Sequence, residues 1–518
     1  MAAKKPARKA SGQSPTQPPT KPAKVANSGP PAKSGDLLEM ADAIAMLKTT
    51  RPTFYRWLRE GRFRGMKVGR QWRFERGEID RFLRGEEPRI ELRGDMKPLL
   101  KTLEDRARTH GIKATSLPAD NDVQRALKLM LELGAAMASD FHLSPHMSES
   151  SDTRIAHLRY RIDGVLYTIA QFDVRLLPPI IEQWKIAARM NLHESRPQDG
   201  RLTFNVAGES KPVDVRVCIV PTQMGDSLTA RVLRADATAI ALDKIDYSPR
   251  DREKILRALH RPWGLILVTG PTGCGKTTAL YSCLSHYISP EVKIMTIEDP
   301  VEFSFPWMEQ VSVNPKEGVS FASAIRAFLR SAPNIIMVGE IRDLDVLGIC
   351  QQAALTGHMV LTTLHAEDAV KALQRMLEMG SPPFLVADCT RLIISQRLVR
   401  RLCPSCSVKA EPPAATLRKA ETLARSGGVD WDAIGHDFRK AVGCIKCRKL
   451  GYMGRNVIAE VLEMTPQIAE ALRRKASLDE LRTIAVGEGM TTMAADGVRK
   501  AAAGLTTLDE VLGTLSIL

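Results

Sequence analysis

A glycine-rich loop between an apolar run and a helix-forming segment constrains the fold of this chain most. Residues 270–277 read G-P-T-G-C-G-K-T, directly after the apolar run Leu265–Val268. The glycines let backbone N–H groups point at a phosphate, and the helix expected from Lys276 adds its positive dipole end. Lys276 is expected to reach the β- and γ-phosphates, and the Thr277 hydroxyl to bind magnesium. The predicted nucleotide-binding residues are Gly270, Pro271, Thr272, Gly273, Cys274, Gly275, Lys276, Thr277 and Thr278.

Alternating strands and helices are expected after this loop. Apolar runs predict strands at Lys293–Ile297, Ile335–Val338 and Met359–Thr362. Strands that alternate with helical segments form a parallel sheet with helices on both faces. The fold class of this region is therefore predicted as α/β.

Two glutamates stand where predicted strands end. Glu298 follows the first of these strands, and Glu340 follows the second. Ligands collect at the carboxyl ends of strands in open α/β sheets, so both side chains are expected to face the nucleotide. There they would hold Mg²⁺ or orient the attacking water. The alternative for a single strand-end acid is a cap on the next helix.

Two histidines flank the third predicted strand. His358 precedes it and His365 follows it, so they cannot occupy the same place. One is expected to sense the γ-phosphate while the other contacts a neighbouring domain. The alternative for each is a hydrogen-bonded core residue.

Positive charge is concentrated at the N-terminus. The chain has a net charge of +15 over 518 residues. Residues 1–35 carry seven Lys or Arg and no acid, and residues 36–88 carry 12 basic and nine acidic residues, so these 88 residues hold 7 + 3 = +10. A polyanionic partner would meet this end. No run approaches the roughly 18 apolar residues that cross a bilayer, and no signal peptide is evident, which predicts a cytoplasmic protein with peripheral membrane association only.

Residues 36–87 predict a winged helix-turn-helix. Helical spacing runs from Leu37 to Leu47, and a second helix is expected over Thr53–Glu60. Two short β-runs, around residues 66–68 and 71–74, precede a last helix at Glu78–Leu83. The segments F-Y-R-W-L-R-E-G-R-F and K-V-G-R-Q-W-R-F resemble excisionase and MerR-type DNA-binding modules.

This resemblance implies a DNA-binding surface. Major-groove contacts would come from the second helix, and a phosphate contact from the wing. The DNA-binding residues that the resemblance implies are Thr53, Tyr55, Arg56, Arg59 and Arg70. The alternative is a protein-docking or purely structural domain.

Four cysteines form two C-x-x-C pairs. They are Cys403, Cys406, Cys444 and Cys447, and residues 407–443 separate the pairs. In a cytosolic chain such pairs indicate metal ligands, and four thiolates suit a structural Zn²⁺ site with no open position. The alternative is four free thiols.

From about residue 118 to the end, the chain resembles the type II secretion and type IV pilus assembly ATPases. The motifs that carry the resemblance are the loop at 270–277, T-I-E-D-P-V-E-F at 296–303, I-I-M-V-G-E-I-R-D at 335–343 and T-G-H-M-V-L-T-T-L-H at 356–365. R-P-Q-D-G-R at 196–201 and Q-R-L-V-R-R-L-C-P-S-C at 396–406 also match.

The resemblance implies a hexameric motor that binds ATP between an α+β domain and a RecA-like domain. Catalytic roles would fall to Lys276, Glu298, Glu340, His358, His365, Arg216 and Arg231, with Arg326, Arg330 and Arg342 as further cationic candidates. The cofactors would be ATP, Mg²⁺ and Zn²⁺. The tetracysteine segment, which retraction-type motors generally lack, would contact an inner-membrane platform protein or a neighbouring subunit.

These expectations divide the chain into seven parts. They are a disordered basic tail (1–35), the winged helix-turn-helix (36–87), a linker (88–117), the α+β domain (118–236), the RecA-like ATPase domain (237–400), a tetracysteine zinc subdomain (401–460) and a C-terminal helical region (461–518). A second hypothesis makes the chain a DNA-binding ATPase that acts in DNA uptake or regulation.

The chain departs from the family pattern at two places. Cys274 replaces the usual serine, which the loop backbone should tolerate. Ser331, Ala332 and Asn334 stand in a segment that usually reads arginine-glutamine-aspartate-proline-aspartate, so polar or acidic positions are neutralised there.

Overall fold

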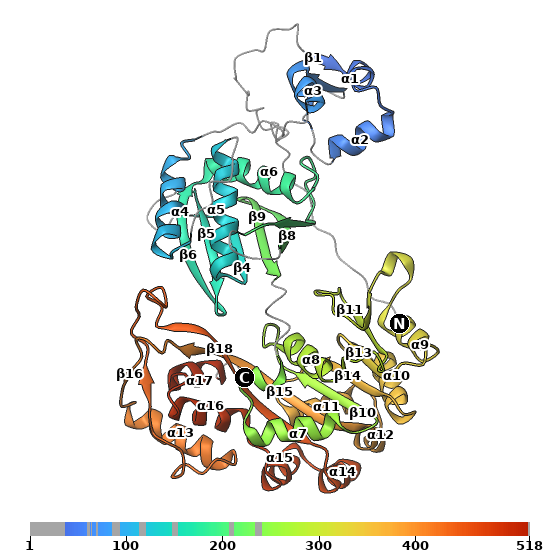
Figure 1. The fold of residues 1–518 in the computed structure, drawn as a ribbon, viewed down its shortest axis with the longest axis vertical. Helices are drawn as coiled ribbons and strands as arrows, with labels where there is room; N and C mark the ends of the chain where they lie inside the picture. Colours follow the sequence, from blue (N-terminus) through green and yellow to red (C-terminus); the bar gives the residue numbers. More distant parts are fainter. Residues whose placement is uncertain are drawn as a thin grey trace, which may run out of the picture. The chain divides into compact units, whose positions relative to one another are not determined.

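The computed structural model describes residues 37–59, 63, 65–68, 71–84, 94–112, 121–147, 154–206, 212–233 and 241–515 (Figure 1). The chain forms two compact units, with the division near Pro88. The expected tail at 1–35 lies outside the described residues.

The N-terminal unit is a small helix-turn-helix with a three-stranded sheet. Its elements are β1 (Leu37–Glu39), α1 (Met40–Met46), α2 (Arg51–Arg59), β2 (Met66–Val68), β3 (Gln71–Glu75) and α3 (Arg76–Leu83). The sheet is antiparallel in the order β1-β3-β2. The prediction of a helix from Leu37 is wrong for its first three residues, which form strand β1. This strand pairs with β3 and places Leu38 opposite Phe74. Phe54 packs against Phe63 in a tilted arrangement and against Phe74 edge to face, at ring-centroid distances of 4.9 and 5.1 Å, and the three rings lie in the core of this unit.

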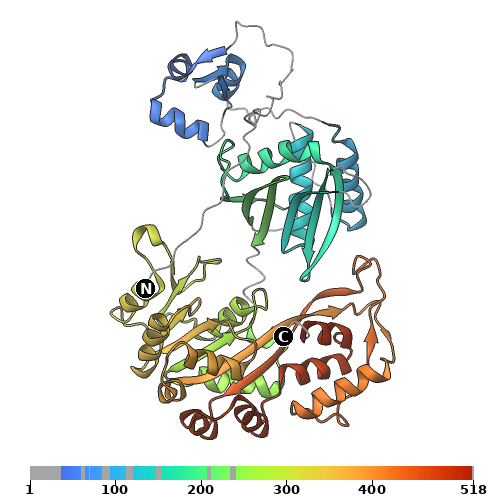
Figure 2. The same cartoon turned by 180° about the vertical axis from the view of Figure 1, so that it is seen from behind.

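The second unit begins with an α+β domain built on a six-stranded antiparallel sheet. The strands are β4 (Asp140–Met147), β5 (Arg154–Ile162), β6 (Val165–Asp173), β7 (Gln198–Phe204), β8 (Val213–Thr222) and β9 (Gly225–Leu233), in the order β6-β5-β4-β9-β8-β7. The helices α5 (Asp122–Met137) and α6 (Leu177–Ala187) cover one face, as Figure 2 also shows. Buried and less buried residues alternate along β5 and most of β8, so these strands turn one side to the core and a more polar side away from it.

The segment predicted as a linker contributes to this domain. Helix α4 (Lys97–Thr109) buries Leu99, Leu103 and Ala107 in the same core as α5. These residues recur every four positions and form one apolar stripe. The sequence predicts a weak helix within a linker over 88–117; a helix is present there as α4, but its buried residues make it part of this domain rather than of a linker.

The region predicted as an ATPase domain contains a seven-stranded sheet in the order β12-β11-β13-β14-β10-β15-β18. Its strands are β10 (Gly264–Thr269), β11 (Ile294–Glu298), β12 (Met308–Ser312), β13 (Ile335–Val338), β14 (Met359–Leu364), β15 (Thr390–Leu402) and β18 (Tyr452–Glu463). All pairs are parallel except β15 with β18. The three predicted strands are confirmed as β11, β13 and β14. Strands β15 and β18 both belong to this sheet and cross the expected domain boundaries at 400 and 460.

Helices cover both faces of the sheet (Figure 1). They are α7 (Pro249–Leu259), α8 (Lys276–Leu284), α9 (Phe321–Phe328), α10 (Leu344–Leu355), α11 (Ala369–Glu378) and α12 (Pro383–Cys389). The predicted α/β class is thus confirmed.

The C-terminal part contains a short β-ladder and five helices among its described residues. Its elements are β16 (Val408–Lys409), α13 (Ala414–Ser426), β17 (Arg439–Lys440), α14 (Pro466–Arg473), α15 (Leu478–Gly487), α16 (Met493–Ala502) and α17 (Leu508–Leu515). Helix α13 packs against α16 around Trp431 and Phe438. None of the described helices is long and apolar enough to cross a membrane.

Candidate functional site

The glycine-rich loop joins β10 to α8, as the sequence predicts. Gly270, Gly273 and Gly275 have φ angles of +143°, +78° and +89°, a region that favours glycine. A Cβ on Gly270 would lie 2.5 Å from Cys274 Sγ and 2.7 Å from the carbonyl oxygen of Gln396. The backbone can therefore adopt this curl only without a side chain at that position.

Lys276 begins α8 and turns back onto the loop. Its Nζ donates to the carbonyl oxygens of Gly270 at 2.7 Å and Pro271 at 3.1 Å. Burial lowers the pKa of the Lys276 ammonium. Thr277 on the next position is exposed. A cation inside a curled loop at the N-terminus of a nine-residue helix fits a polyphosphate, and the accessible hydroxyl fits a magnesium ion.

Glu340, Arg342 and His365 meet at the carboxyl edge of the sheet. Strands β13 and β14 are adjacent and parallel, so the residues after them lie close together. His365 Nε2 lies 3.4 Å from Glu340 Oε2, and Arg342 Nε donates to Glu340 Oε1 at 2.6 Å. Arg342 also donates to Asp299 Oδ2 at 2.9 Å, which adds the end of β11 to the cluster. The hydrogen bond to Glu340 raises the pKa of Arg342.

Glu298 is held by the protein more tightly than its strand-end position predicts. Its side chain is buried and accepts hydrogen bonds from Thr296 Oγ1 at 2.6 Å, from Gln310 Nε2 at 3.2 Å and from the hydroxyl of Tyr281 on α8. Burial and the bond to Glu298 raise the pKa of Tyr281. Glu298 therefore ties the phosphate-loop helix to β11.

Glu302 in the same acidic motif has a different environment. It is partly exposed and has no hydrogen-bond partner among the residues that the structure describes. A hydrogen bond to Asp140 raises the pKa of Arg231, and the charge of Glu302 adds to this effect. The sequence reasoning missed Glu302, although it is the last acid of T-I-E-D-P-V-E.

His358 does not join this cluster within one chain. It lies at the start of β14, where its Nδ1 is 3.1 Å from the carbonyl oxygen of Ala353. The six residues of β14 lie between His358 and His365, and these seven steps of about 3.3 Å place the two histidines about 23 Å apart. The expectation that the two histidines occupy different places is confirmed, and only His365 reaches Glu340.

Arg216 and Arg231 lie in one row across the polar face of the α+β sheet. Arg201 on β7 faces Arg216 on β8, which in turn faces Arg231 on β9. Asp140 on β4 is opposite Arg231 and accepts a hydrogen bond from its Nε at 2.8 Å. The sequence reasoning missed Arg201 as a site residue, since only strand register aligns it with the other two.

Of the three further arginines, only Arg342 contacts the cluster. Arg326 pairs with Asp345 at 2.7 Å on the surface, and Arg330 is exposed. Asn334 in the altered segment accepts a hydrogen bond from the Lys293 N–H at 2.8 Å and so fixes the start of β11 beside β13. Ala332 has φ +49°.

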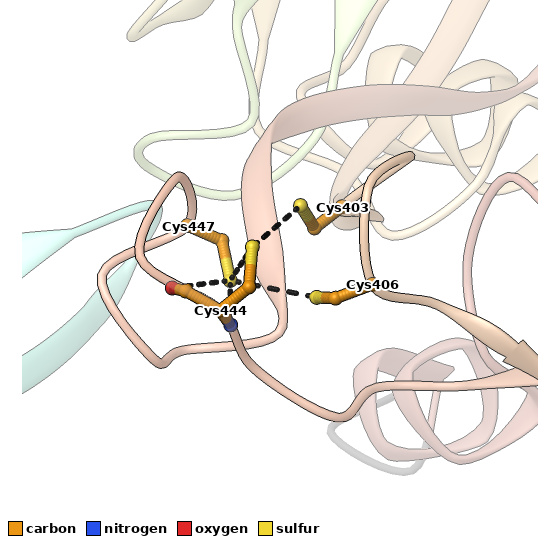
Figure 3. Close-up of side chains that lie close together, drawn as sticks. All are labelled: Cys403, Cys406, Cys444 and Cys447. Atoms are coloured by element: carbon orange, nitrogen blue, oxygen red, sulfur yellow. Dashed lines mark hydrogen bonds between the residues drawn. The ribbon is translucent and has the colours of Figure 1, made fainter.

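The four predicted cysteines come together, as Figure 3 shows. Their sulfur atoms all lie within 4.8 Å of one another. Cys403 and Cys444 are 3.9 Å apart, and Cys406 and Cys447 are 3.6 Å apart. The N–H groups of Cys444 and Gly451 donate to Cys447 Sγ at 3.1 and 3.2 Å. Four converging sulfurs with backbone donors fit a tetrahedral thiolate metal site.

The helix-turn-helix residues are only partly described. Arg56 is exposed on α2, and Thr53 Oγ1 lies 3.0 Å from Thr50 Oγ1. Tyr55 packs against the aromatic core of its own unit. The side chain of Arg59 and residue Arg70 lie outside the described residues.

Comparisons with known proteins agree with this geometry. The chain is 41 % identical over 378 residues to "Type IV pilus assembly ATPase PilB" of Myxococcus xanthus, a match that covers 73 % of this chain and 64 % of that protein. It is 38 % identical over 385 residues to "Type II secretion system protein HxcR" of Pseudomonas aeruginosa, covering 74 % of this chain and 75 % of that protein. The chain thus spans less than two thirds of the Myxococcus protein.

A solved structure shares the fold. The ATPase DotB of Legionella pneumophila matches with a TM-score of 0.55 and 20 % identity, over 76 % of this chain and 95 % of DotB. A helix-turn-helix domain model matches residues 37–87, and a model described as type II/IV secretion system protein matches residues 119–513. The chain therefore belongs to the type II/IV secretion system protein family and carries a helix-turn-helix domain at its N-terminal end.

Proposed function

We propose that this protein is a Mg²⁺-dependent ATPase that powers assembly of a type IV pilus or a type II secretion pseudopilus. The observation that carries the proposal is that β13, β14 and β10 are parallel neighbours, so the cluster of Glu340, Arg342 and His365 and the phosphate loop lie at the same edge of the sheet, where the charge of Glu340 acts on Lys276. Phosphoryl transfer to water needs mostly positioning and charge neutralisation, and this edge offers cations, carboxylates and backbone donors for both. The names of the matched relatives support the choice of process.

Each residue at this edge has a proposed role. The loop N–H groups and Lys276 hold the β- and γ-phosphates, while Thr277 and Glu340 hold Mg²⁺ or its waters. A bound Mg²⁺ would neutralise charge on the phosphate oxygens. Glu302 orients the attacking water, and Glu298 positions α8 against the acidic motif. Arg201, Arg216 and Arg231 supply positive charge from the α+β domain.

The assembly state and location are proposals from family membership. We infer a homo-hexamer in the cytoplasm that associates peripherally with the inner membrane through a platform protein. The tetracysteine cluster would bind one structural Zn²⁺ per chain. Its closed set of four sulfurs supports a structural role.

The N-terminal unit is proposed to bind duplex DNA. The helix-turn-helix match and the excess of basic residues over 1–88 support this choice. The test is anisotropy of a labelled duplex with the full chain over a range of salt concentrations. Steep loss of binding with salt is expected, because released counterions dominate such affinity. Absence of salt-sensitive binding would indicate a protein-docking domain.

A genetic experiment tests the process. Deletion of the gene in its own host should abolish either surface pili or secretion of a defined set of proteins. Restoration by the wild-type gene, but not by a Lys276→Ala gene, is expected. Unchanged piliation and unchanged secretion in the deletion strain would contradict the proposal.

A further inference from the structure

A buried glutamine supports the phosphate loop from the neighbouring strand. Gln396 on β15 is 1 % exposed, and its Nε2 donates to the carbonyl oxygen of Cys274 at 2.9 Å. The hydroxyl of Tyr247, itself 3 % exposed, donates to Gln396 Oε1 at 2.7 Å. Both bonds use the amide in one orientation, with oxygen as acceptor and nitrogen as donor, so each partner fixes the side chain for the other.

The contact lies where the loop has least support of its own. Cys274 stands between Gly273 and Gly275, two glycines with positive φ. The N–H of Cys274 donates to the Pro271 carbonyl oxygen at 3.4 Å, which is long for a hydrogen bond. A Cβ on Gly275 would lie 3.1 Å from Gln396 Nε2, so the glutamine also packs directly against the backbone. Gln396 thus gives this part of the loop a hydrogen bond from outside the loop.

Tyr247 connects this anchor to the start of the ATPase domain. It follows the 3-10 turn at Leu242–Lys244, where the chain enters this domain after the α+β domain in sequence. Its ring packs in the core that also contains Leu280 and Leu284 of α8. One hydrogen-bonded chain therefore runs from this segment through β15 to the phosphate loop.

We propose that Gln396 and Tyr247 are positioning residues that hold the phosphate loop in its phosphate-binding conformation before nucleotide arrives. This inference rests on the proposed ATPase function and adds two residues to its machinery. A preorganised loop loses little freedom on binding, so loss of the anchor should weaken nucleotide affinity. Loss of the amide also leaves a buried carbonyl and a buried hydroxyl without partners.

The chain supplies its own probe for loop order. The Cys274 thiol is 3 % exposed, and it lies beside Gly270 in the loop that Gln396 anchors. Cys283 on α8 is 0 % exposed and lies outside the loop, so it serves as an internal reference. Alkylation of each thiol can be followed by peptide mass spectrometry in nucleotide-free protein.

The experiment compares Gln396→Met, Gln396→Glu and Tyr247→Phe in the full chain. Methionine keeps the length of glutamine without its hydrogen bonds, and glutamate sets a carboxylate against the Cys274 carbonyl. The control is Tyr287→Phe, which removes a similar hydroxyl bond, from Tyr287 to the Leu259 carbonyl at 2.5 Å in the same domain. The readouts are the Cys274 alkylation rate, the Kd for MgADP, and KM and kcat for ATP.

In Gln396→Met, we expect Cys274 to be alkylated about tenfold faster than in the wild type, while the alkylation rate of Cys283 stays the same. The Kd for MgADP should rise about tenfold. Gln396→Glu should change both the Cys274 alkylation rate and the MgADP affinity at least as much as Gln396→Met does. Tyr247→Phe should change them less, and Tyr287→Phe should match the wild type in all readouts. The inference would be overturned if Gln396→Met had the Cys274 alkylation rate and the MgADP affinity of the wild type. It would also be overturned if Tyr287→Phe changed these two quantities as much as Gln396→Met does. A wild-type chain that hydrolyses no ATP would instead refute the proposed function, while the alkylation rates would still decide the role of Gln396.

Discussion

His365 Nε2 lies 3.4 Å from Glu340 Oε2, across the ends of two neighbouring parallel strands. This pair joins the histidine-containing motif to the acid that follows β13, and Arg342 bonds the same carboxylate. The pair therefore links the loop after β14 to the glutamate that is proposed to hold Mg²⁺ or its waters.

His365→Ala should lower kcat for ATP hydrolysis at least tenfold and change KM little, because His365 contacts Glu340, which is proposed to hold Mg²⁺ or its waters during the reaction. Steady-state phosphate release measures both parameters. His358→Ala is the matched comparison, since His358 lies at the other end of β14. A larger loss of kcat in His358→Ala than in His365→Ala would contradict this assignment.

The two acids of T-I-E-D-P-V-E should differ in their effects. Glu302→Gln should lower kcat by about 10²–10⁴-fold without changing thermal stability, as expected for loss of a general base. Glu298→Gln should reduce the free energy of unfolding by about 2–3 kcal/mol, because the buried carboxylate accepts three hydrogen bonds. Kinetics and chemical denaturation separate the two outcomes. Normal kcat in Glu302→Gln would assign the base elsewhere.

The arginine row should act in phosphoryl transfer. Arg216→Ala and Arg201→Ala should each reduce kcat at least tenfold, because positive charge near the transferred phosphoryl group stabilises its transition state. Arg154→Ala, which alters an exposed arginine at the start of β5, is the control. If Arg154→Ala loses as much activity as Arg216→Ala and Arg201→Ala, the loss comes from the lower net charge of the domain and not from the row of arginines.

Metal analysis tests the tetracysteine cluster. The purified chain should contain one Zn²⁺, and Cys406→Ser should lose it and melt at a lower temperature, since metal binding contributes to folding. Cys218→Ser, outside the cluster, should retain the metal. A full complement of zinc in Cys406→Ser would show that the ion binds somewhere else.

Glu460 should make stability depend on pH. Burial and the nearby charge of Asp368 raise the pKa of Glu460 to about 7, from an ordinary value of 4.5. The folded state then binds more protons than the unfolded state between these values, so this group removes stability as pH rises from about 4.5 to about 7. The loss is roughly 3 kcal/mol at most. Glu460→Gln should flatten denaturation free energies over this window, and a steeper profile would contradict the sign.

Sequence patterns predicted the elements whose conformation depends on residues that are adjacent along the chain. The turn between β10 and α8 needs glycines at set positions, and the ends of β11, β13 and β14 follow from apolar runs. Pairing across the sequence was not predictable in this way. The spacing of apolar residues at Leu37–Glu39 predicts a helix, but these residues form a strand because they pair with β3, which contains Phe74. Arg201 lies opposite Arg216 because of the register between β7 and β8, which the sequence does not reveal.

The hydrogen-bond networks of the site could not be inferred from spacing. Glu298 and Glu302 both stand near the end of β11, and only the positions of Tyr281 and Gln310 show that Glu298 is the buried one. Gln396 likewise lies far from the loop in sequence and reaches it because β15 is the neighbour of β10.

The most direct test of the proposed ATPase function is phosphate release from ATP by the purified full chain with Mg²⁺, compared with Lys276→Ala and Glu340→Gln. We expect steady hydrolysis by the wild type and its loss in both variants, while Lys419→Ala, which alters an exposed lysine on α13, should stay active. Undiminished hydrolysis in either site variant, or no hydrolysis by the wild type, would contradict the proposed function.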